Sequence, residues 1–249
     1  MRESAPNVLV IGATSAIAIE LLRIYAKDGA QLYLVGRDHD KLQAVGADLL
    51  IRGAGNTHIG ELDIANFTQH PTVIDNVVNT LARIDIAIVA HGTLTEQGRA
   101  QTDQAYLLHE MNVNGLGAIS ILSLLANVMQ RQKSGTLCAI SSVAGDRGRK
   151  SNYVYGAAKA GVTFFLQGLR NRLAPFGVHV LTVKPGFVIT PMTREFTKNF
   201  LWVEPSVVAK DIYQAIQRNK DVLYTPWFWR WIMLIIKLIP ERIFKKMNL

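Results

Sequence analysis

The sequence has little of several features that mark specialised classes of protein. Its 249 residues include a single cysteine, Cys138, so no disulfide can form within the chain and a reducing compartment is expected. Cys138 lies in an apolar run, where a small core residue is the expected role. Zinc-ligand spacing, internal repeats and low-complexity tracts are lacking, so no metal site is predicted. The first residues show no signal-peptide pattern, which favours a cytoplasmic protein.

Acidic residues are also few, with 19 against 27 basic ones, which gives a net charge of +8. Such a charge favours an anionic partner, which is a phosphate group, an acidic lipid or nucleic acid. Because no basic run is interleaved with aromatic residues outside the C-terminal stretch, we expect no nucleic-acid binding. Apolar residues make up 49% of the chain and charged residues 18%, as in a globular protein that buries its core within one domain.

Short apolar runs alternate with segments of helical period along the first three-quarters of the chain. This order indicates βαβ units, and right-handed crossovers then build a doubly wound parallel sheet of the Rossmann type, an α/β/α sandwich. We expect one domain over residues 1–225, followed by a tail over residues 226–249. The expected strands are 8–11, 32–35, 84–90, 136–140 and 178–183, with a weaker 58–62 and a last strand that ends near Tyr224. The expected helices are 17–28, 41–52, 67–81, 112–131 and 155–176.

The first strand runs into a turn with the sequence IGATSAIA, residues 11–18. In a glycine-rich turn of this kind, backbone N–H groups and the helix N-terminus bind a pyrophosphate. Only Gly12 remains of the three usual glycines, and Ala16 and Ala18 take the other two places. Thr14 and Ser15 add hydroxyl donors. The turn is therefore either a phosphate site or an ordinary connection between a strand and a helix.

The second strand ends at Gly36 and Arg37, where an NAD site would carry an acidic residue for the ribose 2′-hydroxyl. A guanidinium at this place can pair with a 2′-phosphate through two hydrogen bonds, which favours NADP(H) over NAD(H). The alternative is a solvated surface arginine. After the third strand, Asp63 is expected to accept from the adenine amino group, with Ile64 against the ring.

The strongest local signal is ISSVAGDRGRKSNYVYGAAKAG, residues 140–161. Tyr155 and Lys159 are four residues apart on an expected helix and so share one face, and Ser142 ends the fifth strand. Reduction of a carbonyl group needs a proton donor at its oxygen, and a tyrosine can serve at neutral pH when a nearby cation stabilises its phenolate. We therefore expect Lys159 to lower the pKa of Tyr155, and Ser142 to hold the carbonyl oxygen.

These motifs make the chain resemble the classical short-chain dehydrogenases/reductases over nearly its whole length. The resemblance implies an NAD(P)-dependent oxidoreductase in which Tyr155 is the catalytic acid/base and Lys159 binds the nicotinamide ribose. It gives Asn112 the role of holding a water in the proton relay, for which Asn114 is the alternative. Together with the residues above, the implied cofactor contacts are Gly12, Thr14, Ser15, Ala16, Ile17, Arg37, Asp63, Ile64, Ala90, His91, Gly92, Tyr155, Lys159, Pro185, Gly186, Val188 and Thr190.

One segment departs from the family pattern. The usual Asn-Asn-Ala-Gly after the fourth strand is Val89-Ala90-His91-Gly92 in this chain. His91 is therefore expected near the cofactor, either as a structural part of its wall or with a direct part in the chemistry. Neither this change nor the sparse glycines removes a catalytic group, so an active enzyme is expected.

Two segments are candidates for substrate contact. Arg147, Arg149 and Lys150 lie between Ser142 and Tyr155, where loops of the family border the substrate mouth. They either clamp an anionic group or form a solvated charge run. Residues 187–205 form the expected lid over the substrate. Its aromatic side chains, Phe187 and Phe196 among them, either face an apolar stem or pack on each other.

The C-terminal stretch from Trp227 to Ile239 is apolar and carries three of the four tryptophans. A membrane span needs about 20 apolar residues, so a spanning helix is not expected. Arg230 and Lys237 fall on one helical face, and Pro240 is expected to end or kink the helix. A narrow charged stripe with tryptophans and nearby basic residues is typical of a helix that lies in the membrane interface. The alternative is a contact between subunits of a dimer or tetramer.

The first turn, the catalytic segment and the tail together resemble, more loosely, the decaprenylphosphoryl 2-keto-pentose reductases within the family. This resemblance implies a polyprenyl-phosphate keto-sugar as substrate and a separate flavin oxidase as partner enzyme. We therefore expect an NADPH-dependent ketone reductase, acting at the cytoplasmic membrane surface on a lipid-linked or amphipathic substrate. The alternatives are a soluble reductase of a 3-ketoacyl, steroid-like or small carbonyl substrate, and a non-catalytic NADP-binding regulatory or scaffold protein.

Overall fold

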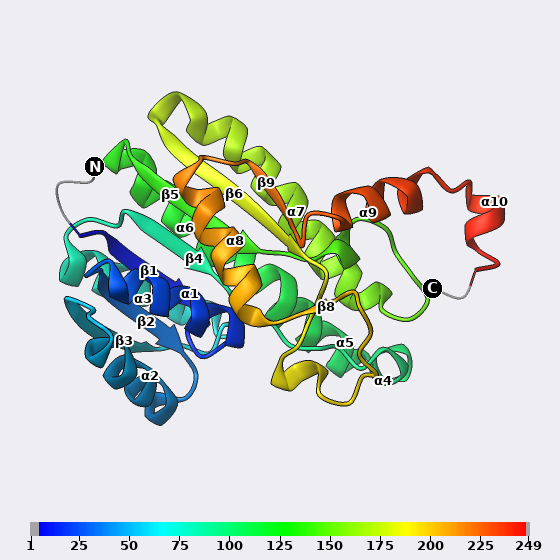
Figure 1. Cartoon of the computed structure of the whole chain (residues 1–249), viewed down its shortest axis with the longest axis horizontal. Coiled ribbons are helices and arrows are strands. Elements are labelled where there is room, and N and C mark those ends of the chain that lie inside the picture. The colour runs from blue at the N-terminus through cyan, green and yellow to red at the C-terminus, as the bar shows by residue number, and fades with distance from the viewer. Residues whose placement is uncertain (1–4, 248–249) are drawn as a thin grey trace.

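The computed structural model describes residues 5–247 and shows a seven-stranded parallel sheet with helices on both faces (Figure 1). The strand order β3-β2-β1-β4-β5-β6-β9 starts in the middle of the sheet and winds outwards in both directions, so the predicted doubly wound sheet is confirmed. The strands are β1 (Asn7–Ile11), β2 (Gln31–Gly36), β3 (Asn56–Glu61), β4 (Ile86–Val89), β5 (Gly135–Ile140), β6 (Val178–Pro185) and β9 (Val222–Thr225). Of the two predicted segments, 1–225 and 226–249, the outermost residues 1–4 and 248–249 lie outside the described residues.

The central strands form where the residues are apolar on both faces of the sheet. Every residue of β4 is buried, and in β1 all but Asn7 are buried. Parallel strands covered on both faces have continuous apolar sequences, which is why the sequence predicts them. By contrast, β3 lies at the sheet edge and has no buried residue, which accounts for its weaker signal.

Three helices cover each face of the sheet. On one face lie α1 (Ala16–Lys27), α2 (His39–Ile51) and α8 (Pro205–Gln217). On the other lie α3 (His70–Leu81), α6 (Gly117–Gln132) and α7 (Tyr153–Leu173). Each set closes a separate apolar core against the sheet. The loops at the carboxyl ends of the strands stay free, and ligands bind there in open α/β sheets.

Shorter helical elements complete the fold. Helices α4 (Gln97–Thr102) and α5 (Gln104–Met111), which like α8 are not among the expected helices, precede the π-helical turn η2 (Asn112–Leu116). The 3-10 turns are η1 (Phe67–Gln69), η3 (Val143–Gly145), η4 (Ala174–Phe176) and η5 (Pro191–Thr193). Within residues 5–247, the continuous helix Gln104–Gln132 is the one stretch long and apolar enough to cross a membrane. Half of its most apolar window is buried inside the fold, as in a core helix.

The C-terminal part leaves the sheet at its β9 edge. A small two-stranded sheet of β7 (Phe187–Val188) and β8 (Trp202–Val203) first closes the base of the loop between β6 and α8. After β9, which ends near Tyr224 as predicted, α9 (Trp229–Leu238) and α10 (Glu241–Phe244) project from one end of the molecule (Figure 1). Pro240 separates the two helices, so the predicted break is confirmed.

Candidate active site

A groove of about 330 Å³ lies at the carboxyl ends of the central strands. The predicted cofactor residues that line it are Gly12, Thr14, Ser15, Ala16, Arg37, Ile64, His91, Gly92 and Thr190. The groove is also lined by residues that were not among the expected cofactor contacts: Ile11, Val35, Gly36, Leu62, Thr93, Val113, Pro191 and Met192. Most of these residues are next to an expected contact in the sequence. That adjacency is the signal by which they could have been predicted.

The turn after β1 has the geometry of a phosphate cradle. Gly12 has φ of +83°, and a Cβ at this position would lie 2.5 Å from the backbone nitrogen of His91. Only glycine therefore fits the turn and the close approach of the loop after β4. Ser15 caps α1 by accepting from the N–H of Ala18 at 3.3 Å, which directs the helix N-terminus towards the groove. These residues fit the pyrophosphate of a nicotinamide dinucleotide.

Several predicted contacts support the groove from outside its lining. Asp63 is exposed, and its Oδ1 accepts from the N–H of Ala65 at 3.0 Å. Its contact with adenine stays a prediction. Ile17, which packs on the core, and Gly186 are half-buried, and Ala90, Pro185 and Val188 are buried.

Ser142, Tyr155 and Lys159 come together where β5 ends and α7 begins. Ser142 is hydrogen-bonded to Tyr155. Its Oγ also accepts from the N–H of Ala144 at 3.1 Å, which leaves its O–H free to donate. The Lys159 ammonium lies 5.8 Å from the centre of the Tyr155 ring and donates to the carbonyl of Ile140 at 3.3 Å. The three groups predicted from their spacing thus share one site.

Burial governs the ionisation of this site. It raises the pKa of Tyr155 to about 12, and the hydrogen bond with Ser142 only partly opposes this. Burial of the hydroxyl outweighs the other effects on this pKa, and the expected lowering by Lys159 stays a prediction. Tyr155 therefore keeps its proton at neutral pH and can give it to a carbonyl oxygen that Ser142 holds. A nicotinamide cofactor supplies the hydride when bound.

The rate of reduction is expected to fall as the pH rises through about 8, because burial lowers the pKa of Lys159 to about 8. Above that pH the neutral amine no longer supports the tyrosinate that forms during proton transfer. The alkaline limb should appear in kcat/KM, which reports ionisation of the free enzyme. Lys159→Arg keeps its charge, so its remaining rate should show no limb in this range. A wild-type profile without such a limb would contradict the role of Lys159.

Asn112 opens the π-helical turn η2, and its carbonyl accepts from the N–H of Gly117. Turns of this kind often mark functional sites. Its competitor Asn114 is fully buried and has its amide engaged: Oδ1 accepts from the N–H of Thr93 at 2.8 Å, and Nδ2 donates to the Glu110 carboxylate at 3.1 Å. Because the Asn114 amide already makes these hydrogen bonds, Asn112 is the better candidate to hold the water of the predicted proton relay.

His91 forms part of the groove wall. Its Nε2 lies 3.0 Å from the carbonyl of Val113 and must carry the proton, since a carbonyl only accepts. Burial, with a smaller effect of the nearby Lys159, lowers the pKa of His91 to about 3, so the ring is neutral. Its Nδ1 has no partner among residues 5–247. These contacts support the wall role over a role as acid.

An aromatic cluster lies in the loop that was predicted to cover the substrate. Phe187 stacks on Trp202 at 5.0 Å between ring centres and meets Trp229 edge-on at 4.9 Å. Phe196 lies further out, half-exposed, at 6.1 Å from Trp202. Phe187 therefore belongs to an ordered wall, and Phe196 lies at its outer end.

The C-terminal helix α9 supplies the other side of this wall. Trp229 and Met233 are buried in one cluster with Val143, the residue that follows Ser142. A Cβ on Gly186 would overlap the indole of Trp229, so the loop that follows β6 rests directly on this helix. The tail is thus part of the site, which the sequence alone did not indicate.

Arg147 does not face the substrate mouth as predicted. Its guanidinium donates to the carbonyls of Ile236 and Ile239 at the end of α9, the latter at 2.6 Å. It also pairs with Glu241 at 3.0 Å and lies 3.7 Å above the ring of Phe244. The free carbonyls at a helix C-terminus attract a cation, so Arg147 holds the tail and is not available as an anion clamp.

Arg149 remains the basic candidate for substrate contact. It is partly buried, and burial lowers the pKa of its guanidinium. Its Nε is buried and lacks a hydrogen-bond partner within the described part of the chain. A buried donor of this kind costs about 1–3 kcal/mol unless another group accepts from it, which favours an anionic or polar acceptor in the complete complex.

A buried ion pair holds the loop after Ser142 on the sheet. The Lys184 ammonium pairs with the Asp146 carboxylate, and the two side chains are 9% and 4% exposed. The Tyr224 hydroxyl donates to the other carboxylate oxygen at 2.7 Å. Burial and the neighbouring Asp146 raise the pKa of Tyr224. Together, Asp146, Lys184 and Tyr224 join the loop after Ser142 to β6 and β9.

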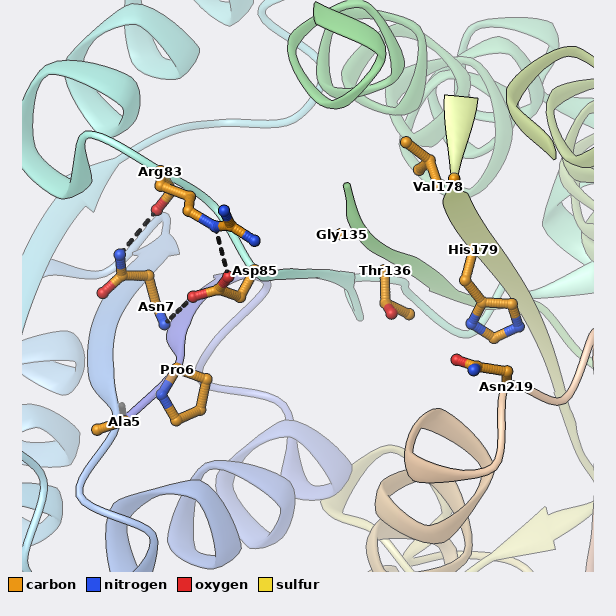
Figure 2. A pocket seen from close by; sticks show the side chains of 11 residues that line it. Ala5, Pro6, Asn7, Arg83, Asp85, Gly135, Thr136, Val178, His179 and Asn219 are labelled. Atoms are coloured by element: carbon orange, nitrogen blue, oxygen red, sulfur yellow. Dashed lines mark hydrogen bonds and ion pairs between the residues drawn. The ribbon is translucent and has the colours of Figure 1, made fainter. Parts of the chain in front are cut away.

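A larger hollow, of about 800 Å³, lies at the opposite ends of the strands (Figure 2). Its charged groups pair with each other: Asp85 accepts from the N–H of Asn7 at 2.9 Å and from Arg83 at 2.8 Å. The Asn7 amide donates to the carbonyl of Arg83 at 3.0 Å. Because these groups are satisfied and lie at the amino ends of the strands, the smaller groove is the better candidate.

Comparison with known proteins agrees with this geometry. A family model for short chain dehydrogenases matches residues 6–200. An uncharacterized oxidoreductase of Mycobacterium tuberculosis is 36% identical over 98% of this chain and 97% of its own length. A short-chain dehydrogenase from Sphingobium yanoikuyae, solved with NADPH, has a TM-score of 0.82 at 23% identity and covers 98% of this chain and 96% of its own. Levodione reductase has a TM-score of 0.81 at 20% identity, over 90% and 97%. The two solved structures show the shared fold.

Proposed function

The chain belongs to the short chain dehydrogenase family, and from this premise we propose that it is an NADPH-dependent reductase of a ketone carried on a lipid-linked or otherwise amphipathic substrate. The family and the oxidoreductase relative make it an NAD(P)-dependent dehydrogenase/reductase. The proposal adds the choice of cofactor and the class of substrate.

One observation carries the substrate class. The wall beside Ser142 is aromatic and apolar, with Phe187, Trp202 and Trp229 in contact. In the loop between Ser142 and Tyr155, Arg149 has a buried donor without a partner in the described chain. A substrate with an apolar stem suits the aromatic wall, and an anionic or polar head next to the stem suits the Arg149 donor. A polyprenyl-phosphate keto-sugar has both parts.

A screen of NADPH oxidation tests the proposal. Prenyl-phosphate keto-sugars should be reduced with a higher kcat/KM than simple ketones or 3-ketoacyl thioesters of matched carbonyl reactivity. Arg149→Gln should remove most of this preference for the phosphate-bearing substrate and leave simple ketones unaffected. Faster turnover of the thioesters or small ketones would show that the substrate class is wrong.

The preference for NADPH has its own test in Arg37. This residue lines the groove at the end of β2, is exposed, and has no hydrogen bond or ion pair to another described residue. A guanidinium pairs with a 2′-phosphate by two charge-assisted hydrogen bonds, each worth about 1.5–3 kcal/mol. Arg37→Ala should therefore weaken NADPH binding by at least about tenfold and leave NADH binding nearly unchanged. Equal effects on the two affinities, measured by calorimetry, would sink the assignment. A related structure was solved with NADPH, which supports the choice.

A further inference from the structure

The outer side of α9 carries an apolar stripe that no residue in the described chain covers. Four of its five members are spaced along the helix so that they fall on one side of it, and the fifth, Trp227, lies two residues before the helix begins. Their exposed fractions run from 41% for Leu234 to 72% for Trp227 and Leu238. This outer stripe consists of Trp227, Trp231, Leu234, Ile235 and Leu238.

The opposite side of the same helix is already used by the fold. Trp229 is 3% exposed and Met233 is fully buried, and they pack with Val143 and Phe187. The helix is therefore apolar on two sides, and the protein itself covers only one. A solvent-exposed apolar surface of this kind marks a binding surface.

Arg147 fixes this helix on the body of the protein. Its guanidinium binds the carbonyls of Ile236 and Ile239, and it contacts α10 through Glu241 and Phe244. The outer stripe is therefore presented in a defined direction, next to the wall of the substrate site.

The charges around the outer stripe identify the kind of partner. Residues 226–247 contain one acidic side chain, Glu241, which is paired with Arg147. A second copy that docked by the same stripe around a two-fold axis would bring like cations together, whereas anionic lipid headgroups attract them. The basic side chains are Arg230, Lys237, Arg242, Lys245 and Lys246.

We propose that α9 and α10 dock the enzyme on an anionic lipid bilayer, with the outer stripe between the headgroups and the acyl chains. Tryptophan favours this depth, and the stems of lysine and arginine let their charges reach the headgroups. Because the inner side of α9 forms the wall of the substrate site, docking brings the site to the bilayer surface. The inference rests on the surface of α9 and does not require the proposed substrate.

Vesicle flotation tests the proposal with point substitutions. Deletion of residues 226–249 is unsuitable because it also removes Trp229 and Met233 from the buried cluster. The full chain should float with phosphatidylcholine vesicles that contain phosphatidylglycerol, and less so with phosphatidylcholine alone or at high salt. Ile235→Glu should lower the partition coefficient by about tenfold or more. The matched control is Ile51→Glu, since Ile51 is 88% exposed at the end of α2, and it should bind like the wild type.

Each other outcome overturns the proposal. If the wild-type chain stays in the soluble fraction at low salt, docking is excluded. If both variants lose vesicle binding equally, the outer stripe is not the docking surface. A dimer that Ile235→Glu dissociates, with no vesicle binding by any form, assigns the stripe to a second copy of the chain. NADPH binding and turnover of a water-soluble ketone should be equal in both variants, so a failure of docking is separable from a failure of the proposed reaction.

Discussion

Replacing Tyr155 with phenylalanine is expected to lower the rate of reduction by about 10²–10⁴-fold, the usual contribution of a positioned acid. The substitution removes one hydroxyl, and Ser142 and Lys159 keep their contacts with Ala144 and Ile140. Cofactor affinity should therefore stay within a factor of about two, because less than about 0.5 kcal/mol of binding is at stake for a group outside the groove lining. Stopped-flow oxidation of NADPH and calorimetric binding measure the two quantities.

Ser142→Ala is the matched control, since it also removes one hydroxyl from the same hydrogen bond. It should slow reduction by loss of the contact to the carbonyl oxygen but keep the pH dependence set by Lys159. If Tyr155→Phe kept full cellular function while losing reduction, the chain would act as a cofactor-binding scaffold and not as an enzyme. If it kept the reduction itself, the assignment of the proton donor would be wrong.

Asp146→Ala is expected to lower the free energy of unfolding by about 3–5 kcal/mol, the range for breaking one side of a buried ion pair. The change leaves the Lys184 ammonium buried without its carboxylate and removes the acceptor of the Tyr224 hydroxyl. It also frees the loop that follows Ser142, so the rate of reduction should fall with stability. Urea unfolding followed by circular dichroism, together with kcat, measures both effects.

The double variant Asp146→Leu with Lys184→Met distinguishes the effect of the ion pair from the effect of the volume that the two side chains fill. Replacing both charges by apolar groups of similar volume is often neutral or stabilising, so much of the lost stability should return. The active-site loop would then be held by packing alone, and kcat shows whether the polar contact also positions Ser142. If the free energy of unfolding of the single variant Asp146→Ala lay within about 0.5 kcal/mol of the wild-type value, the pair would have no structural role.

The sequence predicts the sheet well because its central strands are buried on both faces and so have continuous apolar runs. Helix α8 is not among the expected helices, although the sequence carries a signal for it: Val208, Ile212 and Ile216 repeat every four residues behind Pro205. Only β3 was weak for a physical reason, since none of its residues is buried.

The proximity of the candidate catalytic residues could be predicted because their geometry is local in the chain. Tyr155 and Lys159 share a helix face, and Ser142 follows β5 and caps the turn η3, which contacts that helix. The roles of Arg147 and Asp146 could not be predicted, since their partners lie 89 and 38 residues away on other elements. In the sequence both look like members of a charged loop, and only the packing of α9 and β6 against that loop shows what they bind. Likewise, the raised pKa of Tyr155 follows from burial that spacing does not reveal.

All four tryptophans of the chain lie in β8 and the C-terminal segment, and none lies elsewhere. Trp229 is 3% exposed against Gly186, whereas Trp227 and Trp231 are 72% and 57% exposed on the outer stripe. The intrinsic fluorescence of the protein therefore reports on this one corner without any label. Its blue-shifted component follows the packing of α9 behind the site, and its red-shifted component follows whatever surface α9 meets outside.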